Sequence, residues 1–490
     1  MQWTAEQLAI FETGINDPAN LLVTARAGAA KTTSIVELAN RYPASTKGLF
    51  LAFNKMIQEE AKTRLPSNFR AMTMHGCGMN AWRNFIRRPI KVDRDKIYNL
   101  VTEAASKLDK KEADQIWERF GEIRKAISMA KTAGYIPKPL PSAYRPLTSA
   151  EEFYDLHLDF NAEELEREVI DEVLKQSWRQ TGEGILDFDD MILAPAVAGV
   201  SFDFYDVILT DESQDFSHIN HVMIKKLKTP RTKLISVGDP CQAIYGFRGA
   251  DETSMQSLKE LFSMKELFLT TSFRCSQAVC ENARWRAPDM NSPEWAQPGS
   301  VSTLTAWNPA DIPDGAAIIC RNNAPLFSLA IKLLRVGRYP ELRGRDVLKG
   351  IVAVMKKLGK EKISREEAIR ALDAWYATEK LRQRDSKLLQ DRRECIRIFL
   401  DETETLGQAI AYAKGLGEQS GRIYLMTGHG SKGLEFENVF ILDKHIIDIK
   451  YGQDNNVLYV METRAKLNLT YITSEGFELH DTEEAESVRA

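Results

Sequence analysis

Short apolar runs alternate with amphipathic stretches along the first part of the chain. Segments typical of strands lie at 21–24, 48–53 and 69–75, and each has the length of a strand. The stretches 31–41 and 55–65 place apolar residues at helical spacing between these runs. Alternation of strands and helices in this order predicts a parallel sheet with right-handed crossovers.

Further strand signals occur in two later groups. The runs 207–210, 234–237 and 267–269 would complete the first set of strands. A second set follows, with runs at 316–320, 423–426, 439–442 and 467–472. We therefore expect two α/β units in tandem, each with its own sheet.

Two charged stretches of helical character interrupt these sets of strands. The stretch 78–198 shows helical spacing most clearly over 113–130, and the stretch 350–419 is shorter. We expect each to be a helical insertion. The expected first domain then comprises 1–77 and 199–270, and the expected second domain comprises 271–349 and 420–490.

The composition excludes several classes of protein. The 490 residues include 65 Lys and Arg against 69 Asp and Glu, which gives a net charge of −4. A hydrophobic share of 43% supports sizeable cores and excludes a disordered or fibrous chain. The mild acidity leaves nucleic-acid binding open, because a local basic cleft can focus the potential inside an acidic protein.

Cysteine usage and the lack of long apolar runs indicate a cytoplasmic protein. The six cysteines are scattered and form no Cys-x-x-Cys pair, which favours free thiols over a zinc site. No apolar run reaches the roughly 18 residues that a membrane span needs. The N-terminal residues show no basic start followed by an apolar stretch, so we expect no secretory signal and no membrane association.

A loop of small residues, 25–32, stands between a predicted strand and a predicted helix. This is the context of a phosphate-binding loop, in which backbone N–H groups at a helix N-terminus face an anion. Lys31 would reach the β- and γ-phosphates, and the Thr32 hydroxyl would bind Mg²⁺. The match is imperfect, since Ala25 and Ala30 stand where the motif has glycine. A small-residue loop before a Lys-Thr helix also arises by chance.

An acidic pair follows the predicted strand 207–210. Asp211 and Glu212 would lie at the carboxyl end of that strand, where open α/β sheets bind ligands. Asp211 could hold Mg²⁺, and Glu212 could activate an attacking water. The alternative is an ordinary helix N-terminus with acidic residues in its first turn. The phosphate-binding loop upstream favours the NTPase interpretation.

The segment 237–250 extends these features into a recognisable series. With it, the chain resembles the UvrD/Rep/PcrA group of superfamily 1 DNA helicases, in a compact form that would suit a phage or mobile element. The segments that carry the resemblance stand in the family's order: 4–7, 25–32, 52–55, 73–76, 187–190, 211–215, 237–250, 269–274, 426–436 and 458–466. The resemblance implies an α/β fold with two tandem RecA-like P-loop NTPase domains and helical insertions. ATP with Mg²⁺ would bind between these domains.

By position, the resemblance implies roles in ATP binding and hydrolysis. Gln7 would read the adenine edge, and Phe273 would stack on the base. Glu212 would be the general base, with Thr32 and Asp211 holding the metal. The phosphate-binding loop would comprise Ala27, Gly28, Ala29, Ala30, Lys31, Thr32 and Thr33. The γ-phosphate would be contacted by Gln242, Arg274 and Arg464, and the ribose by Glu435.

The resemblance also implies a set of DNA-binding residues. Tyr245 and Phe247 would stack on bases of single-stranded DNA, and Arg248 would meet phosphate. The further DNA contacts would be Phe53, Asn54, His75 and His429. Without the resemblance, core packing would be the simpler interpretation of the aromatic pair, and a structural role is as reasonable for His75.

The resemblance implies an ATP-dependent translocase and DNA helicase. It would act 3′ to 5′ on single-stranded and tailed duplex DNA, in replication, recombination or repair, in the cytoplasm of its cell or of a phage's host. An alternative is a nucleic-acid clamp that binds ATP but hydrolyses it slowly, because Ala30 alters the phosphate-binding loop. A metabolic P-loop kinase would lack the segments 426–436 and 458–466.

Overall fold

The computed structural model describes residues 2–139, 144–158, 160–246, 253–382, 386–450 and 452–478. Phe247 and Arg248 lie outside the described residues. The chain forms two compact units. The first comprises Met1–Ala25 and Ala30–Leu269, and the second comprises Arg26–Ala29 and Thr270–Ala490. Each unit is described by itself below.

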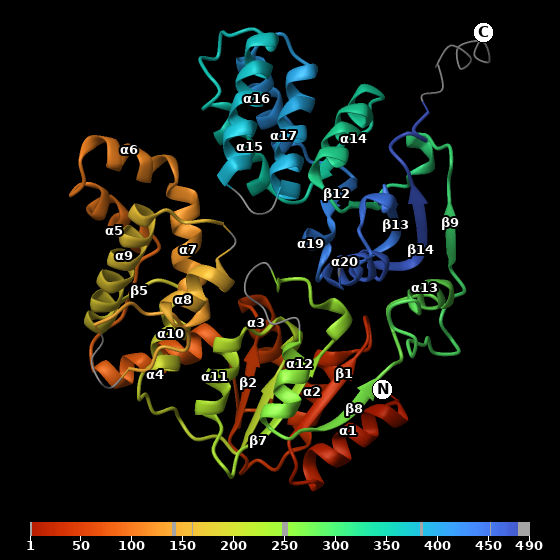
Figure 1. The fold of residues 1–490 in the computed structure, drawn as a ribbon. Coiled ribbons are helices and arrows are strands. Elements are labelled where there is room, and N and C mark those ends of the chain that lie inside the picture. The colour runs from red at the N-terminus through yellow and green to blue at the C-terminus, as the bar shows by residue number, and fades with distance from the viewer. Residues whose placement is uncertain are drawn as a thin grey trace. The chain divides into compact units, whose positions relative to one another are not determined.

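The first unit is built on a six-stranded sheet in which every strand pair is parallel (Figure 1). Its order is β3-β2-β6-β7-β1-β8. The strands are β1 (Leu21–Ala25), β2 (Gly48–Ala52), β3 (Phe69–Thr73), β6 (Val207–Thr210), β7 (Lys233–Gly238) and β8 (Lys265–Leu269). All residues of β1, β2 and β6 are buried, as their continuous apolar runs predict.

Helices connect the strands of this sheet. They are α1 (Ala5–Asn16), α2 (Lys31–Arg41), α3 (Lys55–Arg64), α4 (Met74–Ile86), α11 (His218–Leu227) and α12 (Ser254–Leu261). The strand predicted over 69–75 ends two residues early, because Thr73 caps α4 by accepting the N–H of Gly76. The predicted domain boundary at residue 78 falls inside α4, where Trp82 packs against α10 residues such as Met191.

The first insertion is helical and has its own core. Its helices are α5 (Lys96–Ala105), α6 (Lys110–Glu118), α7 (Phe120–Ala133), the short α8 (Ala150–Glu152), α9 (Glu164–Glu183) and α10 (Asp190–Val197), and β4 (Lys91–Val92) pairs with β5 (Ile185–Leu186). The helical character expected over 113–130 is confirmed, as two helices that are separated where Arg119 leaves the helical conformation between α6 and α7. Its buried guanidinium pairs with Glu166 of α9 at 3.0 Å.

The second unit also has a six-stranded parallel sheet, in the order β11-β12-β10-β13-β14-β9. Its strands are β9 (Ser300–Thr303), β10 (Ala317–Cys320), β11 (Pro340–Leu342), β12 (Ile423–Thr427), β13 (Phe436–Leu442) and β14 (Ala465–Ile472). The two edge strands β9 and β11 were not expected from the sequence, because one is polar and the other has three residues. The α/β fold class with two sheets is confirmed.

Helices of the second unit surround the sheet and form the second insertion. Those near the sheet are α13 (Gln277–Ala283), α14 (Asn323–Arg335), α19 (Gly428–Ser431) and α20 (Gly452–Glu462). Those of the insertion are α15 (Arg345–Met355), α16 (Arg365–Arg382), α17 (Ser386–Asp401) and α18 (Leu406–Glu418). The helical insertion thus begins five residues before the expected boundary at 350.

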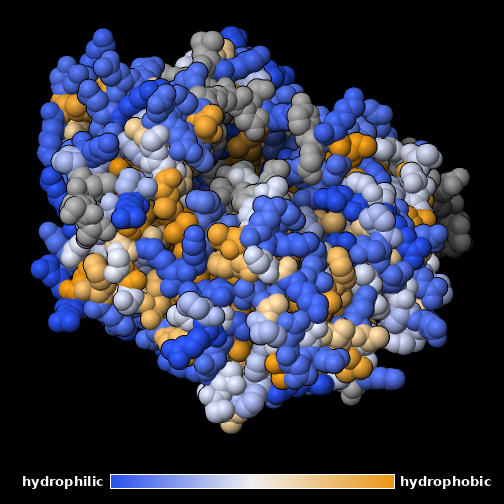
Figure 2. All heavy atoms as spheres, turned by 60° about the horizontal axis from the view of Figure 1, so that its bottom comes forward, coloured by the Kyte–Doolittle hydropathy of each residue, from blue (hydrophilic) through white to orange (hydrophobic). Residues whose placement is uncertain are grey.

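Hydrophilic residues cover most of the face drawn in Figure 2, with hydrophobic residues in small groups among them. Within the described part of the chain, no helix is long and apolar enough to cross a membrane. All six cysteines are buried free thiols, as expected from their scattered positions.

Candidate nucleotide and nucleic-acid sites

The N-terminus of α2 is open to an anion. Ala30 is its N-cap residue, lies in the left-handed conformation (φ 55°, ψ 40°) and makes no side-chain capping bond. The first N–H groups of the helix therefore have no side-chain acceptor at the N-cap, as in helices that bind phosphate. Glycine is the residue that adopts this conformation without strain, which is the physical reason that the motif prefers glycine at this position.

The loop residues Arg26–Ala29 belong to the second unit. In that unit Arg26 forms a bidentate pair with Asp289, with Nε–Oδ1 at 2.6 Å and Nη2–Oδ2 at 2.9 Å. The Ala27 N–H donates to the Tyr459 hydroxyl at 3.1 Å. Gly28 has a φ of +74°, and a Cβ there would lie 2.5 Å from the Ser272 Oγ. Neither the backbone angle nor the space would accept a side chain at this point of the loop.

Two close pairs join the start of α2 to the end of β6. The Thr32 hydroxyl donates to Asp211 Oδ2 at 2.5 Å, and Lys31 Nζ lies 3.5 Å from Glu212 Oε1. Burial raises the pKa of Asp211 to about 6, and the negative charge of Glu212 adds to the shift. A hydroxyl beside a carboxylate, next to a lysine, is the donor set that a Mg²⁺–nucleotide requires. These residues therefore fit ATP and Mg²⁺.

A chain of hydrogen bonds connects Glu212 to Gln242 within the first unit. Gln214 donates to Glu212 Oε2 at 2.5 Å and accepts the Asp239 N–H at 3.0 Å. The Asp239 carboxylate in turn accepts from Gln242 Nε2 at 2.6 Å. Sequence reasoning missed Gln214 and Asp239, although both lie inside the motif segments. The signal was Gly238, where a Cβ would lie 2.6 Å from Gln214 Oε1.

Gln7 is buried where α1 meets α2. Its carbonyl accepts the Thr4 N–H in a capping box, and its amide donates to the Ser34 hydroxyl at 3.0 Å. Thr33 accepts a hydrogen bond from Arg64 at 3.1 Å. Ser34 lies one turn after Lys31 in α2, so this hydrogen bond places Gln7 near the start of that helix. The role of Gln7 toward adenine stays a prediction.

The predicted arginines of the second unit are held by acceptors of that unit. Arg274 donates from Nε to Glu435 Oε2 at 2.7 Å, and Lys466 binds the other carboxylate oxygen at 2.8 Å. Burial alone would raise the pKa of Glu435, but Lys466 and Arg274 outweigh it and lower that pKa. Arg464 is 1% exposed and donates to the carbonyls of Val460 and Leu434, at 2.8 and 3.2 Å.

Phe273 lies beside Arg274 and is half-exposed. Its ring faces that of Trp295 with centroids 6.4 Å apart and an interplanar angle of 26°. A partly exposed aromatic face next to arginine is suited to stacking on a base. Trp295, at 73% exposure, is an aromatic residue that sequence reasoning did not single out.

Several residues predicted to bind DNA lie at the carboxyl ends of strands in the first unit. Phe53, just after β2, stacks on Tyr245 with centroids 6.3 Å apart and an interplanar angle of 11°. Asn54 caps α3 by accepting the Ile57 N–H at 2.9 Å. His75, in the first turn of α4, lies edge-on to Phe188, with ring centroids 6.2 Å apart. Burial lowers the pKa of its imidazole.

Phe188 is the DNA-binding candidate that sequence reasoning missed. It lies in the acidic segment 187–190, is 49% exposed, and has the Arg94 guanidinium 5.8 Å from its ring centroid. The signal was one aromatic residue inside a short run of aspartates. His429 lies in α19 of the second unit, where Thr427 caps the helix by accepting the Gly430 N–H at 3.2 Å.

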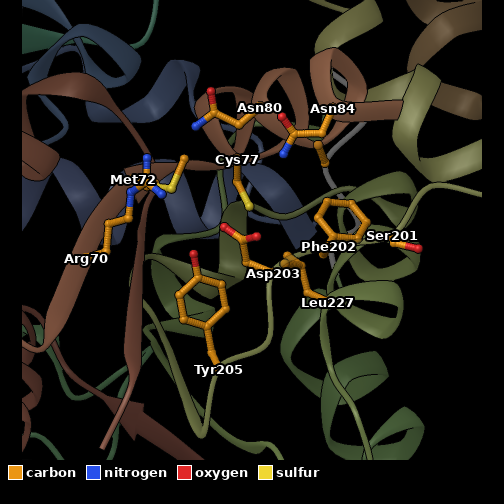
Figure 3. A pocket seen from close by; sticks show the side chains of 11 residues that line it. Arg70, Met72, Cys77, Asn80, Asn84, Ser201, Phe202, Asp203, Tyr205 and Leu227 are labelled. Carbon is orange, nitrogen blue, oxygen red and sulfur yellow. The ribbon is translucent and has the colours of Figure 1, made fainter. Parts of the chain in front are cut away.

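A small cavity lies beside β3 and α4 of the first unit. Figure 3 shows the Cys77 thiol, the Asp203 carboxylate and the Tyr205 hydroxyl turned toward the same space, with Arg70 beside them. The cavity holds about 20 Å³, which is room for about one water and not for a nucleotide. Burial raises the pKa of Cys77 to about 12, which agrees with a packing role for this thiol.

Comparison with known families gives the same assignment as this geometry. The family model for the UvrD/REP helicase N-terminal domain matches residues 3–263, and the model for the UvrD-like helicase C-terminal domain matches residues 346–476. The chain belongs to the UvrD/Rep helicase family. Lys31, Thr32, Asp211 and Glu212 all lie in the match to the N-terminal domain of this family.

Three relatives to which the chain is similar are distant in sequence. F-box DNA helicase protein 1 of Schizosaccharomyces pombe is 25% identical, over 95% of this chain and 57% of its own length. F-box DNA helicase 1 of Gallus gallus is 24% identical, over 94% of this chain and 48% of its own length. The ATP-dependent DNA helicase Rep of Buchnera aphidicola is 32% identical over 20% of this chain and 16% of its own. The chain thus spans about half the length of the first two relatives.

Proposed function

We propose that the protein is an ATP-dependent translocase on single-stranded DNA that unwinds duplex DNA in the 3′ to 5′ direction. The observation that carries this proposal is the pairing of Lys31 with Glu212 and of Thr32 with Asp211 beside an open helix N-terminus. Family membership and the names of the relatives support helicase activity. The direction rests on the resemblance of the segment 237–250 to helicases that move 3′ to 5′.

The residues of the first unit divide the work of ATP hydrolysis. Lys31 and the N–H groups at the start of α2 bind phosphate, and Thr32 with Asp211 holds Mg²⁺. Bound Mg²⁺ neutralises the charge that develops on the phosphate oxygens. Glu212 accepts the proton of the attacking water, and Gln214 fixes its carboxylate by a 2.5 Å hydrogen bond.

The second unit supplies the remaining groups. Arg274 and Arg464 contact the γ-phosphate, Glu435 the ribose and Phe273 the adenine, and Gln7 of the first unit reads the base edge. Arginine near the transferred phosphoryl group stabilises charge in the transition state. Release of Arg274 from Glu435 would accompany nucleotide binding, since both side chains are partly exposed.

Aromatic residues bind the DNA strand. Phe53 and Tyr245 already stack on each other, and Phe188 presents a half-exposed ring beside His75. Each stacked base contributes roughly 1–3 kcal/mol regardless of sequence. This suits a protein that moves along single-stranded DNA of any sequence, in replication, recombination or repair.

The clamp alternative rests on Ala30, and the geometry does not favour it. Ala30 takes the left-handed conformation that glycine would take at that position, so the substitution leaves the backbone of the loop in place. The cost is strain of about 1–2 kcal/mol and not a lost donor.

Strand displacement on tailed duplexes tests the proposed function. The purified protein is mixed with ATP, Mg²⁺ and a labelled duplex that carries a 3′ tail, a 5′ tail or blunt ends. We expect displacement from the 3′ tail, and none with Lys31→Ala, which should keep the parent melting temperature. Displacement from the 5′ tail alone would contradict the direction, and DNA binding without ATP hydrolysis would support the clamp.

A further inference from the structure

The acidic segment 187–190 turns its carboxylates inward and one ring outward. Asp187 and Asp190 are 8% and 1% exposed, while Phe188 between them is 49% exposed. The half-buried Asp189 accepts a 2.6 Å hydrogen bond from Ser128 of α7. Carboxylates are rarely buried without partners, so the groups that hold them determine where Phe188 points.

Lys96, on α5, is the first of these groups. Its side chain is fully buried, and its ammonium donates to Asp190 Oδ2 at 2.6 Å. It also donates to the carbonyls of Ser177 and Ile185 and to the Thr181 hydroxyl, at 2.8 to 2.9 Å. These partners lie on α9, β5 and α10, so one ammonium group joins four elements of the insertion.

Lys131, on α7, completes the network. Its ammonium lies 2.7 Å from Asp190 Oδ1 and 2.5 Å from Asp187 Oδ2. Asp187 also accepts the Asp190 N–H at 2.9 Å, and Asp190 accepts the Asp187 N–H at 3.0 Å. Asp190 therefore bridges two lysines, and the turn that carries Phe188 is fixed from both sides. Buried ion pairs add little net stability, but their directional bonds can specify one conformation.

Arg94 lies against the ring that this network holds. This exposed residue lies two positions before Lys96, and its guanidinium lies over the Phe188 ring, 5.8 Å from the centroid. Phe188 also contacts His75 of α4. The Lys96–Asp190 pair thus joins the start of the insertion to its end. Arg94 lies two residues before Lys96, and Phe188 lies two residues before Asp190.

We propose that Lys96, through Asp190, is a positioning residue that holds Phe188 and Arg94 as one unit for single-stranded DNA. Phe188 offers a ring for a base, and Arg94 offers a cation for the neighbouring phosphate. This inference rests on the proposed function, since it concerns the same DNA strand. Nothing in the family match assigns a role to Lys96 or Arg94.

The test measures binding of a fluorescent oligothymidylate by anisotropy, with melting temperature and DNA-independent ATPase on the same preparations. Phe188→Ala should raise Kd by about 5- to 150-fold, the equivalent of one stack. Arg94→Ala should reduce the slope of log Kd against log salt by about 0.7, as loss of one phosphate contact does. Neither substitution should change the melting temperature, because both side chains are largely exposed.

Lys96→Met probes the positioning role. Its removal leaves Asp190 paired with Lys131, so the fold should persist with a lower melting temperature. Lys96→Met should raise the Kd for DNA about as much as Phe188→Ala does. The double variant, with both substitutions, should have a Kd no higher than that of the single variant with the higher Kd. The matched control is Lys107→Met. Lys107 is an exposed lysine just after α5 that pairs with Glu103, and its replacement should leave the Kd for DNA at the parent value.

The outcomes separate this inference from the proposed function. Parent-like DNA binding by Phe188→Ala, or losses for Lys96→Met and Phe188→Ala that multiply in the double variant, would overturn the inference. If Lys96→Met does not fold, Lys96→Gln replaces it in the same cycle, because it removes the ion pair with Asp190 but keeps a hydrogen-bond donor at this position. A parent protein that neither binds the oligonucleotide nor hydrolyses ATP would overturn the proposed function itself.

Discussion

A strand in each sheet runs into a carboxylate with the same unusual backbone conformation. After β6, Glu212 has φ 52° and ψ 42°, and after β13, Asp443 has φ 54° and ψ 51°. A one-turn 3₁₀ helix follows each of them. This left-handed conformation costs a non-glycine residue about 1–2 kcal/mol, so each carboxylate must be stabilised by its surroundings.

The partners of the two carboxylates differ. Asp443 accepts the Ser474 N–H at 2.7 Å and the Ser474 hydroxyl at 2.5 Å, which closes a loop inside its own unit. Glu212 lies 3.5 Å from the Lys31 ammonium and accepts from Gln214. Backbone strain at a strand end therefore does not by itself identify a catalytic residue. Glu212 differs from Asp443 in its pairing with Lys31, the residue that we propose to bind phosphate.

The largest expected effect is a loss of ATP hydrolysis on replacement of Arg464, a residue of the second unit. We expect Arg464→Ala to lower the rate of ATP hydrolysis on the order of 10³-fold or more, the usual contribution of an arginine at the γ-phosphate. Its buried guanidinium also binds two carbonyls, so the melting temperature should fall. Phosphate release is measured well below that temperature, and a parent-like rate there would contradict the assigned role.

Glu212→Gln tests the catalytic member of the pair. We expect hydrolysis to fall by about 10²–10⁴-fold, because glutamine cannot accept the proton of the attacking water. Glutamine keeps the shape of the side chain, so binding of a fluorescent ATP analogue and the melting temperature should stay at parent values. Hydrolysis at the parent rate would exclude Glu212 as the general base.

Asp443→Asn tests the structural member of the pair. The substitution weakens two hydrogen bonds to Ser474, and we expect the free energy of unfolding to fall by about 1–3 kcal/mol. Urea denaturation measures this change. At temperatures where the variant is folded its ATPase should equal that of the parent, and a selective loss of ATPase without a loss of stability would remove the contrast with Glu212.

The smallest expected effect concerns Ala30. Ala30→Gly relieves left-handed strain of about 1–2 kcal/mol but adds about 0.4–1 kcal/mol of unfolded-state entropy, so the free energy of unfolding should rise by at most about 1.6 kcal/mol. The ATPase should change little. A rise in ATPase of more than about tenfold (about 1.4 kcal/mol) would mean that alanine limits hydrolysis, in favour of the clamp alternative.

The buried strands were predictable because their apolar runs are continuous, as in β1 and β2. The edge strand β9 was not, because its polar side chains give no periodic signal and its place depends on pairing with β14. The break at Arg119 was missed for a similar reason, since it depends on a buried contact with Glu166 across the insertion.

The candidate site followed the same division. The motif spacing identified Lys31, Thr32, Asp211 and Glu212, and the structure brings all four together. Gln214 was missed because its hydrogen bonds to Glu212 and Asp239 depend on the distance between β6 and β7. Local motifs carry the residues that we propose to touch ligand, whereas the groups that hydrogen-bond to them depend on the tertiary fold.

Phosphate release by the parent, Glu212→Gln and Asp443→Asn, with and without single-stranded DNA, tests the central claim most directly. We predict that DNA stimulates hydrolysis by the parent and by Asp443→Asn to the same extent, and that Glu212→Gln stays inactive in both conditions. Equal losses in the two variants, or a parent rate that does not respond to DNA, would contradict the account.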